Sequence, residues 1–207
     1  MSKELILFDI DKTLFDRGSL KQSFGEFYEK VAGKIEQPID VVNKVRSEYE
    51  SNLESSSDFH PEELLKYFSE SFKIDKNVLD QYFQRRRMYE RSLYPEVKGV
   101  LNELKNDYEL GIFSEGFVDI QLNKLSDSNI LEFFSPQYIF IERRKLNDNV
   151  ISKLPECIIV DDKKEVVDRL KREERITPIL IERKDEPKSG DSIRSLTDIT
   201  DLLGFKN

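Results

Sequence analysis

A short apolar run near the start of the chain constrains the fold more than any other feature, because it ends in carboxylates. Leu5 to Ile10 reads LILFDI, and Asp9 and Asp11 stand at its end, with Thr13 just beyond. A run of this length without polar alternation is typical of a strand buried on both faces of a parallel sheet. Carboxylates at its end are therefore expected at the sheet edge where ligands bind.

Residues 17–94 carry only helical patterns. Apolar side chains recur there at steps of three and four residues, which is the signature of a buried helix face. The four stripes are Leu20 to Ile35, Val42 to Leu53, Leu64 to Phe72 and Val78 to Tyr89. We therefore expect an all-helical domain over residues 17–94, inserted into a core made of residues 1–16 and 95–207.

The pattern changes after Pro95 to strands that alternate with helices, ending with a flexible loop at Glu182–Asp191 and a last helix. The predicted strands are Tyr108–Phe113, Tyr138–Ile141, Cys157–Val160 and Ile179–Ile181. The predicted helices are Val97–Leu104, Phe117–Leu125, Asn147–Leu154, Lys163–Glu173 and Ser192–Leu203. Such alternation predicts right-handed crossovers and a doubly wound, Rossmann-like parallel sheet, so the fold class is α/β.

Composition narrows the classes of partner. The chain has 33 Lys and Arg against 41 Asp and Glu, a net charge of −8, which opposes non-specific binding to nucleic acid or anionic lipid. We find neither a membrane span nor a signal peptide. A single Cys cannot form an internal disulfide, and one Cys with one His cannot supply a zinc-type ligand set. We expect a cytoplasmic protein with a small-molecule partner, no nucleic acid and no membrane.

Acidic and hydroxyl side chains end several of the predicted strands. Asp9 and Asp11 end the first, Ser114 ends the next, and Asp161 and Asp162 end a later one. The carboxyl ends of parallel strands line one crevice, so these groups are expected to converge. Crowded carboxylates repel one another unless a hard cation neutralises them, and Mg²⁺ is the natural candidate.

Four segments then resemble the motifs of the haloacid dehalogenase-like superfamily, in the family's order. They are FDIDKTLFD, LYPEVKGVLNELKNDYELGIFSEG, ERRKLNDNVISKLP and CIIVDDKKEVVDRL. The helical insert lies between the first two, where the family carries its cap. The resemblance thus implies a Rossmann-like parallel core with an inserted all-helical cap domain whose residues recognise the organic part of the substrate.

The resemblance also implies catalytic roles. Asp9 would be the nucleophile that forms an aspartyl-phosphate, and Asp11 would protonate the leaving oxygen and later draw a proton from water. Ser114 would donate a hydrogen bond to a phosphoryl oxygen. Lys145 would place a positive charge beside the nucleophile and the phosphoryl group.

Metal and substrate contacts follow from the same match. The implied ligands of Mg²⁺ are Asp9, Asp11 (through its backbone carbonyl), Asp162 and Asp161, with the choice of direct ligand between the last two left open. The expected substrate contacts are Thr13, Ser114, Glu115 and Gly116.

Two departures from the common pattern stand out. Lys12 occupies a place that is often Gly, and Glu115 stands where Asn is frequent. The third motif matches least well, because Arg143, Arg144 and Lys145 are adjacent and any of them could supply the site cation.

These features predict a magnesium-dependent phosphohydrolase that cleaves a small phosphorylated metabolite. Dehalogenases of the superfamily lack the second Asp, so Asp11 argues against carbon–halogen cleavage. Phosphoryl transfer, as in a phosphoglucomutase-like member, stays open, as do the identity of the ester and the oligomeric state. The early position of the Asp-x-Asp-x-Thr run disfavours a receiver-like signalling protein, and the intact acids count against a non-catalytic scaffold.

Overall fold

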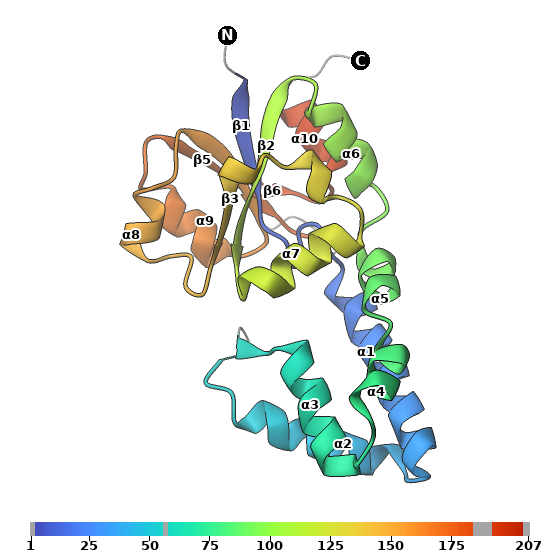
Figure 1. Ribbon diagram of the computed structural model, residues 1–207. Coiled ribbons are helices and arrows are strands. Elements are labelled where there is room, and N and C mark those ends of the chain that lie inside the picture. Colours follow the sequence, from blue (N-terminus) through green and yellow to red (C-terminus); the bar gives the residue numbers. More distant parts are fainter. Residues whose placement is uncertain (1–2, 56–57, 184–191, 205–207) are drawn as a thin grey trace. The chain divides into compact units, whose positions relative to one another are not determined.

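The chain folds into two compact units. The computed structural model describes residues 3–55, 58–183 and 192–204. Contacts divide the chain into an α/β unit, Met1–Asp16 with Leu93–Asn207, and a helical unit, Arg17–Ser92. Figure 1 labels the helices and strands of both units.

The α/β unit is built on a parallel sheet, as the sequence predicts. Its strands run in the order β3-β2-β1-β4-β5-β6, and all neighbouring pairs are parallel. The strands are β1 (Glu4–Phe8), β2 (Tyr108–Glu115), β3 (Ile139–Glu142), β4 (Cys157–Asp161), β5 (Ile176–Ile181) and β6 (Ser192–Ile193). The direction of winding reverses between β1 and β4, and a ligand crevice is expected at such a switch point.

Helices cover both faces of this sheet (Figure 1). The helices α8 (Asp148–Ile151) and α9 (Lys164–Leu170) lie on one face; on the other are α6 (Val97–Leu104), α7 (Val118–Asp127) and α10 (Thr197–Leu202). Two 3₁₀ turns, η2 (Leu131–Phe133) and η3 (Pro136–Tyr138), precede β3. The doubly wound α/β class is therefore confirmed.

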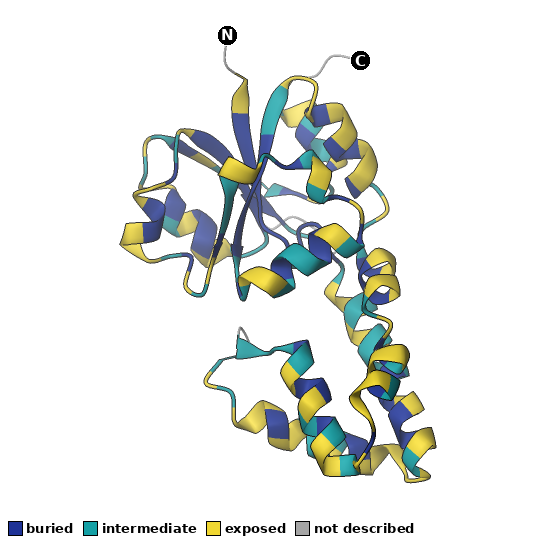
Figure 2. Ribbon diagram, in the orientation of Figure 1, coloured by how far each residue is buried: buried dark blue, intermediate teal, exposed yellow. Residues whose placement is uncertain are grey.

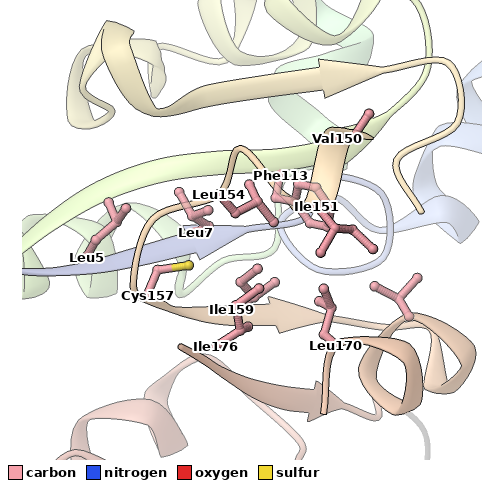
Figure 3. Close-up of a cluster of buried hydrophobic side chains, with 11 residues drawn as sticks. Leu5, Leu7, Phe113, Val150, Ile151, Leu154, Cys157, Ile159, Leu170 and Ile176 are labelled. Carbon is pink, nitrogen blue, oxygen red and sulfur yellow. The ribbon is translucent and has the colours of Figure 1, made fainter. Parts of the chain in front are cut away.

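The face of the sheet that carries α8 and α9 is closed by a continuous apolar cluster (Figure 3). Its residues are Leu5, Leu7, Phe113, Val150, Ile151, Leu154, Cys157, Ile159, Val166, Leu170 and Ile176. Cys157 belongs to this core, and burial raises the pKa of its thiol to about 12. Packing of this kind fixes the strands, and thereby the side chains that follow their ends.

The helical unit has an aromatic core of its own. It contains α1 (Arg17–Ile35), α2 (Ile39–Ser51), α3 (Pro61–Phe72), α4 (Lys76–Phe83) and α5 (Arg85–Ser92). Phe27 stacks on Phe68 with ring centroids 5.9 Å apart and meets Phe83 edge-on at 5.4 Å. Figure 2 shows buried positions recurring along one side of these helices, with exposed positions between them. No described helix of the chain is both long and apolar enough to cross a membrane.

Two of the predicted helices differ from the structure, and one predicted loop lies mostly outside the described residues. The predicted helix over Val78–Tyr89 is two helices, because Gln84 adopts a left-handed conformation (φ 47°) that ends α4. The predicted helix Ser192–Leu203 begins as strand β6, whose Ser192 and Ile193 pair with β5. The helix α10 starts only at Thr197, and the carboxylate of Asp198 accepts the amides of Arg194 and Ser195 in the turn before it. Most of the predicted loop Glu182–Asp191 lies outside the described residues.

A matched pair of glycines tests the packing of the sheet. A Cβ on Gly111, in β2, would lie 2.6 Å from Cδ2 of Leu7, whereas a Cβ on Gly99, in α6, would meet nothing within 4 Å. We expect Gly111→Ala to lower the free energy of unfolding by about 1–3 kcal/mol through overpacking. Gly99→Ala should raise it by roughly 0.5–1 kcal/mol, because alanine favours the helix. Equilibrium unfolding in urea measures both, and equal stabilities would contradict the packing described for β2.

Candidate active site

The candidate site lies at the carboxyl ends of the three central strands. Asp9 follows β1 directly, Ser114 lies near the end of β2, and Asp161 is the last residue of β4. The backbone N–H of Asp9 still donates to the carbonyl of Val160 at 2.9 Å, so β1 and β4 stay paired up to the acids. The topology thus brings Ser114 into contact with Asp9, although the two residues are 105 apart in sequence.

Beyond Asp9 the chain makes a tight turn. The amides of Leu14 and Phe15 both donate to the carbonyl of Ile10, at 2.9 and 3.0 Å. Lys12 has a φ of 63°, the left-handed conformation that favours glycine and costs other residues roughly 1–3 kcal/mol. Its ammonium group lies 3.1 Å from the carboxylate of Asp162. This ion pair offsets part of the cost of the turn.

A buried lysine holds the carboxylate of Asp9. Lys145 is 1% exposed, and its ammonium group donates to Oδ1 of Asp9 at 2.8 Å and to Oδ2 of Asp161 at 2.5 Å. The hydroxyl of Ser114 donates to the same oxygen of Asp9 at 3.1 Å. Asp9, Ser114 and Lys145, which the sequence places far apart, are therefore in direct contact.

The two arginines beside Lys145 point elsewhere. The guanidinium group of Arg143 lies over the ring of Phe117, 3.8 Å from its centroid. Arg144 reaches to 3.9 Å from the carboxylate of Glu115. Of the three adjacent cations, Lys145 is the one that meets Asp9.

Three carboxylates form a cluster suited to a cation. Asp9, Asp161 and Asp162 each offer an oxygen, and these oxygens lie within 4.8 Å of one another. Lys145 and Lys12 supply two positive charges against three negative ones, so one negative charge is left over. An all-oxygen donor set with surplus negative charge fits a hard divalent cation such as Mg²⁺. The carboxylate of Asp11 lies outside this cluster.

Burial and crowding change the protonation of these groups. The pKa of Asp9 is raised to about 6: burial is the largest cause, the Lys145 ammonium group opposes it, and the Asp161 carboxylate acts in the same direction as burial. Burial and the Asp9 charge also hold the pKa of Asp162 above its usual range. Burial by itself would lower the pKa of Lys145, but the two carboxylates more than offset this and raise it. Lys145 therefore stays charged between two competing acids.

Asp11 has partners that the sequence did not suggest. Lys124 of α7 donates to both of its carboxylate oxygens, at 2.7 and 2.8 Å. Gln121, one turn earlier on α7, donates to Asp11 at 3.1 Å and to the carbonyl of Glu115 at 2.8 Å. The sequence did carry a signal for these partners: Gln121 and Lys124 are polar residues on the same helix face as the apolar Leu125.

The structure shows the local surroundings of the residues expected to contact the substrate, and those contacts stay predictions. Thr13 has no exposed surface, and its hydroxyl finds no partner within the described part of the chain, so its side chain cannot meet a substrate in this conformation. Gly116 donates its amide to the carbonyl of Glu142 at 2.9 Å, and the amide is thereby engaged within the fold. Glu115 faces Lys163 at 3.7 Å. Ser114 alone of the four contacts Asp9.

Arg183 stabilises the turn that follows Asp9, a role that the sequence reasoning did not predict. It donates to the carbonyl of Thr13 at 2.5 Å, pairs with Glu96, and lies over the ring of Tyr94, 3.8 Å from its centroid. The amide of Tyr94 in turn donates to the carbonyl of Leu14 at 3.0 Å. These contacts tie the two connections to the helical unit together on the α/β side.

Comparison with known proteins identifies the family. The model of the haloacid dehalogenase-like hydrolase family matches residues 6–154, which is most of the chain. The chain belongs to the haloacid dehalogenase-like hydrolases. It is therefore a member of a hydrolase family, as its four motifs predicted. A search of the curated proteins finds no match.

Solved structures share the fold over nearly the whole chain. A phosphatase of this family from Thermococcus onnurineus is 23% identical, with a TM-score of 0.66 and coverage of 97% of this chain and 98% of that one. A 2-haloacid dehalogenase from Pseudomonas syringae is 16% identical, with a TM-score of 0.64 and 99% of each chain covered. The putative hydrolase YfnB from Bacillus subtilis, solved with magnesium, is 16% identical, with a TM-score of 0.60 and coverage of 99% and 100%. At these identities the likeness shows the fold.

The raised pKa of Asp9 makes a prediction for the metal-free protein. Between its unfolded value of 3.8 and about 6, the folded state holds a proton that the unfolded state has lost. Stability therefore falls as pH rises through this window, by up to about 3 kcal/mol from this group. Asp9→Asn removes the effect, so from pH 4 to pH 7 in EDTA the variant should lose less stability than wild type. Urea unfolding at both pH values measures this, and parallel losses would refute the assignment.

Proposed function

We propose that this protein is a magnesium-dependent phosphohydrolase that cleaves a small phosphate ester through an aspartyl-phosphate at Asp9. The observation that carries the proposal is the environment of the Asp9 carboxylate. It is buried, it is held on one oxygen by Lys145 and Ser114, and it adjoins two further carboxylates that can share a cation.

The contacts to Asp9 suit a nucleophile. Lys145 and Ser114 both engage Oδ1, which leaves Oδ2 to attack phosphorus. As the Asp9–phosphorus bond forms, the bond to the leaving oxygen breaks, and charge spreads over the phosphoryl oxygens. The Lys145 ammonium and the Ser114 hydroxyl lie where they can stabilise that charge. Water then attacks the aspartyl-phosphate and releases inorganic phosphate.

The acid and base in these two steps is Asp11. It follows Asp9 by two residues, and its side chain is 45% exposed, so it is open to a substrate while Asp9 is buried. Its proton passes to the leaving oxygen in the first step. The carboxylate takes a proton from the attacking water in the second step, which restores the starting state.

The metal would be held by Asp9, Asp161 and Asp162. Asp161 also accepts the backbone amide of Lys163 at 2.9 Å, a contact that orients it. A bound Mg²⁺ supplies charge that draws the phosphate dianion into an otherwise acidic site. We assign the helical unit the part of a cap that recognises the organic portion of the ester.

Phosphoryl transfer to a sugar hydroxyl would use the same residues, with that hydroxyl in place of water. Dehalogenation is disfavoured, because an acid at Asp11 serves an oxygen leaving group and has no use with a halide.

A direct assay tests the proposal. Wild-type protein with Mg²⁺ should hydrolyse an aryl phosphate such as p-nitrophenyl phosphate, and EDTA should abolish turnover until Mg²⁺ is restored. Asp9→Asn should lose at least about 10³-fold in kcat, because the variant lacks the nucleophile, and Ser114→Ala about 10²-fold, because one donor to the phosphoryl group is lost.

Asp107→Asn is the matched control and should keep wild-type turnover, since this exposed residue precedes β2 at the opposite end of the sheet. Full activity in Asp9→Asn would exclude the covalent mechanism. Halide release from a 2-haloacid, without phosphatase activity, would favour a dehalogenase.

A further inference from the structure

The helix α7 presents polar side chains to the interior of the α/β unit. Its buried positions are Gln121, Lys124 and Leu125, and Ser128 follows at its end. Their spacing of three and four residues is that of a single helix face, which usually packs against a sheet with apolar side chains. Burial of a lysine costs free energy unless a carboxylate pairs with it. Packing alone therefore does not account for Lys124.

The partner of this face is a single carboxylate. Lys124 is 7% exposed and bonds both oxygens of Asp11, and Gln121 adds a third bond to the same group. Gln121 also donates to the carbonyl of Glu115, and Gly116 leaves room for its side chain, because a Cβ there would lie 3.0 Å from Nε2 of Gln121. Two rigidly held donors on one helix thus determine where the Asp11 carboxylate lies.

This arrangement separates Asp11 from the other acids. Asp9, Asp161 and Asp162 share their cluster with Lys145 and Lys12. Asp11 is two residues from Asp9 but has a cation of its own on α7. The contact with Lys124 therefore draws the carboxylate toward α7.

We propose that Lys124, assisted by Gln121, is a positioning residue that holds the Asp11 carboxyl group in line with the leaving oxygen of the substrate. The inference rests on the proposed function and deepens it. Lys124 does not itself touch the reacting atoms. It acts through Asp11, from which the proton moves to the leaving oxygen as the phosphorus–oxygen bond breaks and the bond to Asp9 forms.

Leaving groups of different basicity provide the test. A good leaving group such as p-nitrophenolate departs without a proton, whereas an alkoxide needs one. Lys124→Met should therefore lower kcat/KM for an alkyl phosphate by about 10²-fold and kcat/KM for p-nitrophenyl phosphate by less than about 5-fold. The ratio kcat/KM reports the steps up to release of the leaving group, so the later hydrolysis of the aspartyl-phosphate, which is common to both esters, does not enter it. Asp11→Asn should show the same selective loss.

The double variant distinguishes positioning from a general structural role. In the Asp11→Asn background, Lys124→Met should have no further effect on the dependence of kcat/KM on the leaving group, because the residue it positions is gone. Gln121→Met should show a smaller loss in the same direction and serves if Lys124→Met folds poorly. Lys98→Met, an exposed lysine on α6, should leave both substrates unaffected.

The outcomes separate this inference from the proposed function. An equal loss of kcat/KM for both substrates in Lys124→Met, or losses in kcat/KM that multiply in the double variant, would overturn the positioning role while wild-type turnover still supports the phosphatase. A wild type that turns over neither ester would overturn the proposed function and the positioning role together. Urea unfolding of the same four proteins reports the contact without any assay. The changes in the free energy of unfolding should be non-additive in the double variant, and additive changes would show that the two side chains do not interact.

Discussion

The Lys145 ammonium group lies between two buried carboxylates, and the arrangement of the site depends on it. It bonds Asp9 and Asp161, which end the neighbouring strands β1 and β4, from the loop that follows β3. Three segments from the beginning, middle and end of the α/β unit are thereby joined at one charge. Removing one member of a buried ion pair leaves an uncompensated charge and costs about 3–5 kcal/mol. Loss of Lys145 would therefore leave two buried carboxylates uncompensated and would destabilise this edge of the sheet.

The topology explains why these acids meet at all. β1 and β4 flank the point where the winding of the sheet reverses, so no crossover helix covers their carboxyl ends on both sides. Apolar side chains before the acids pack against α8 and α9, and they fix the strands in register. A polar site with net negative charge can be held there only because the apolar layer below it supplies the stability that the acids remove.

The sequence predicted the sheet and the acids at its edge, because both depend on local patterns. Buried parallel strands are apolar runs, and the motif that ends the first of them has a recognisable spacing. The partners of Asp11 were missed because a lysine in an amphipathic helix is normally assigned to the solvated face. The sequence likewise could not show whether Arg143 or Lys145 contacts Asp9, because the direction of each side chain depends on the path of the chain after β3. The break at Gln84 and the two-residue strand β6 depend on tertiary contacts.

Three lysines form ion pairs with four carboxylates in this site. Lys145 meets Asp9 and Asp161, Lys12 meets Asp162, and Lys124 meets Asp11. When all four acids are ionised, they exceed their lysines by one negative charge. A divalent cation changes that balance to one positive charge, and a chain with a net charge of −8 then presents a locally attractive site to a phosphate dianion. The left-handed turn at Lys12 fits this account, because glycine there would spare the strain but leave Asp162 without its cation.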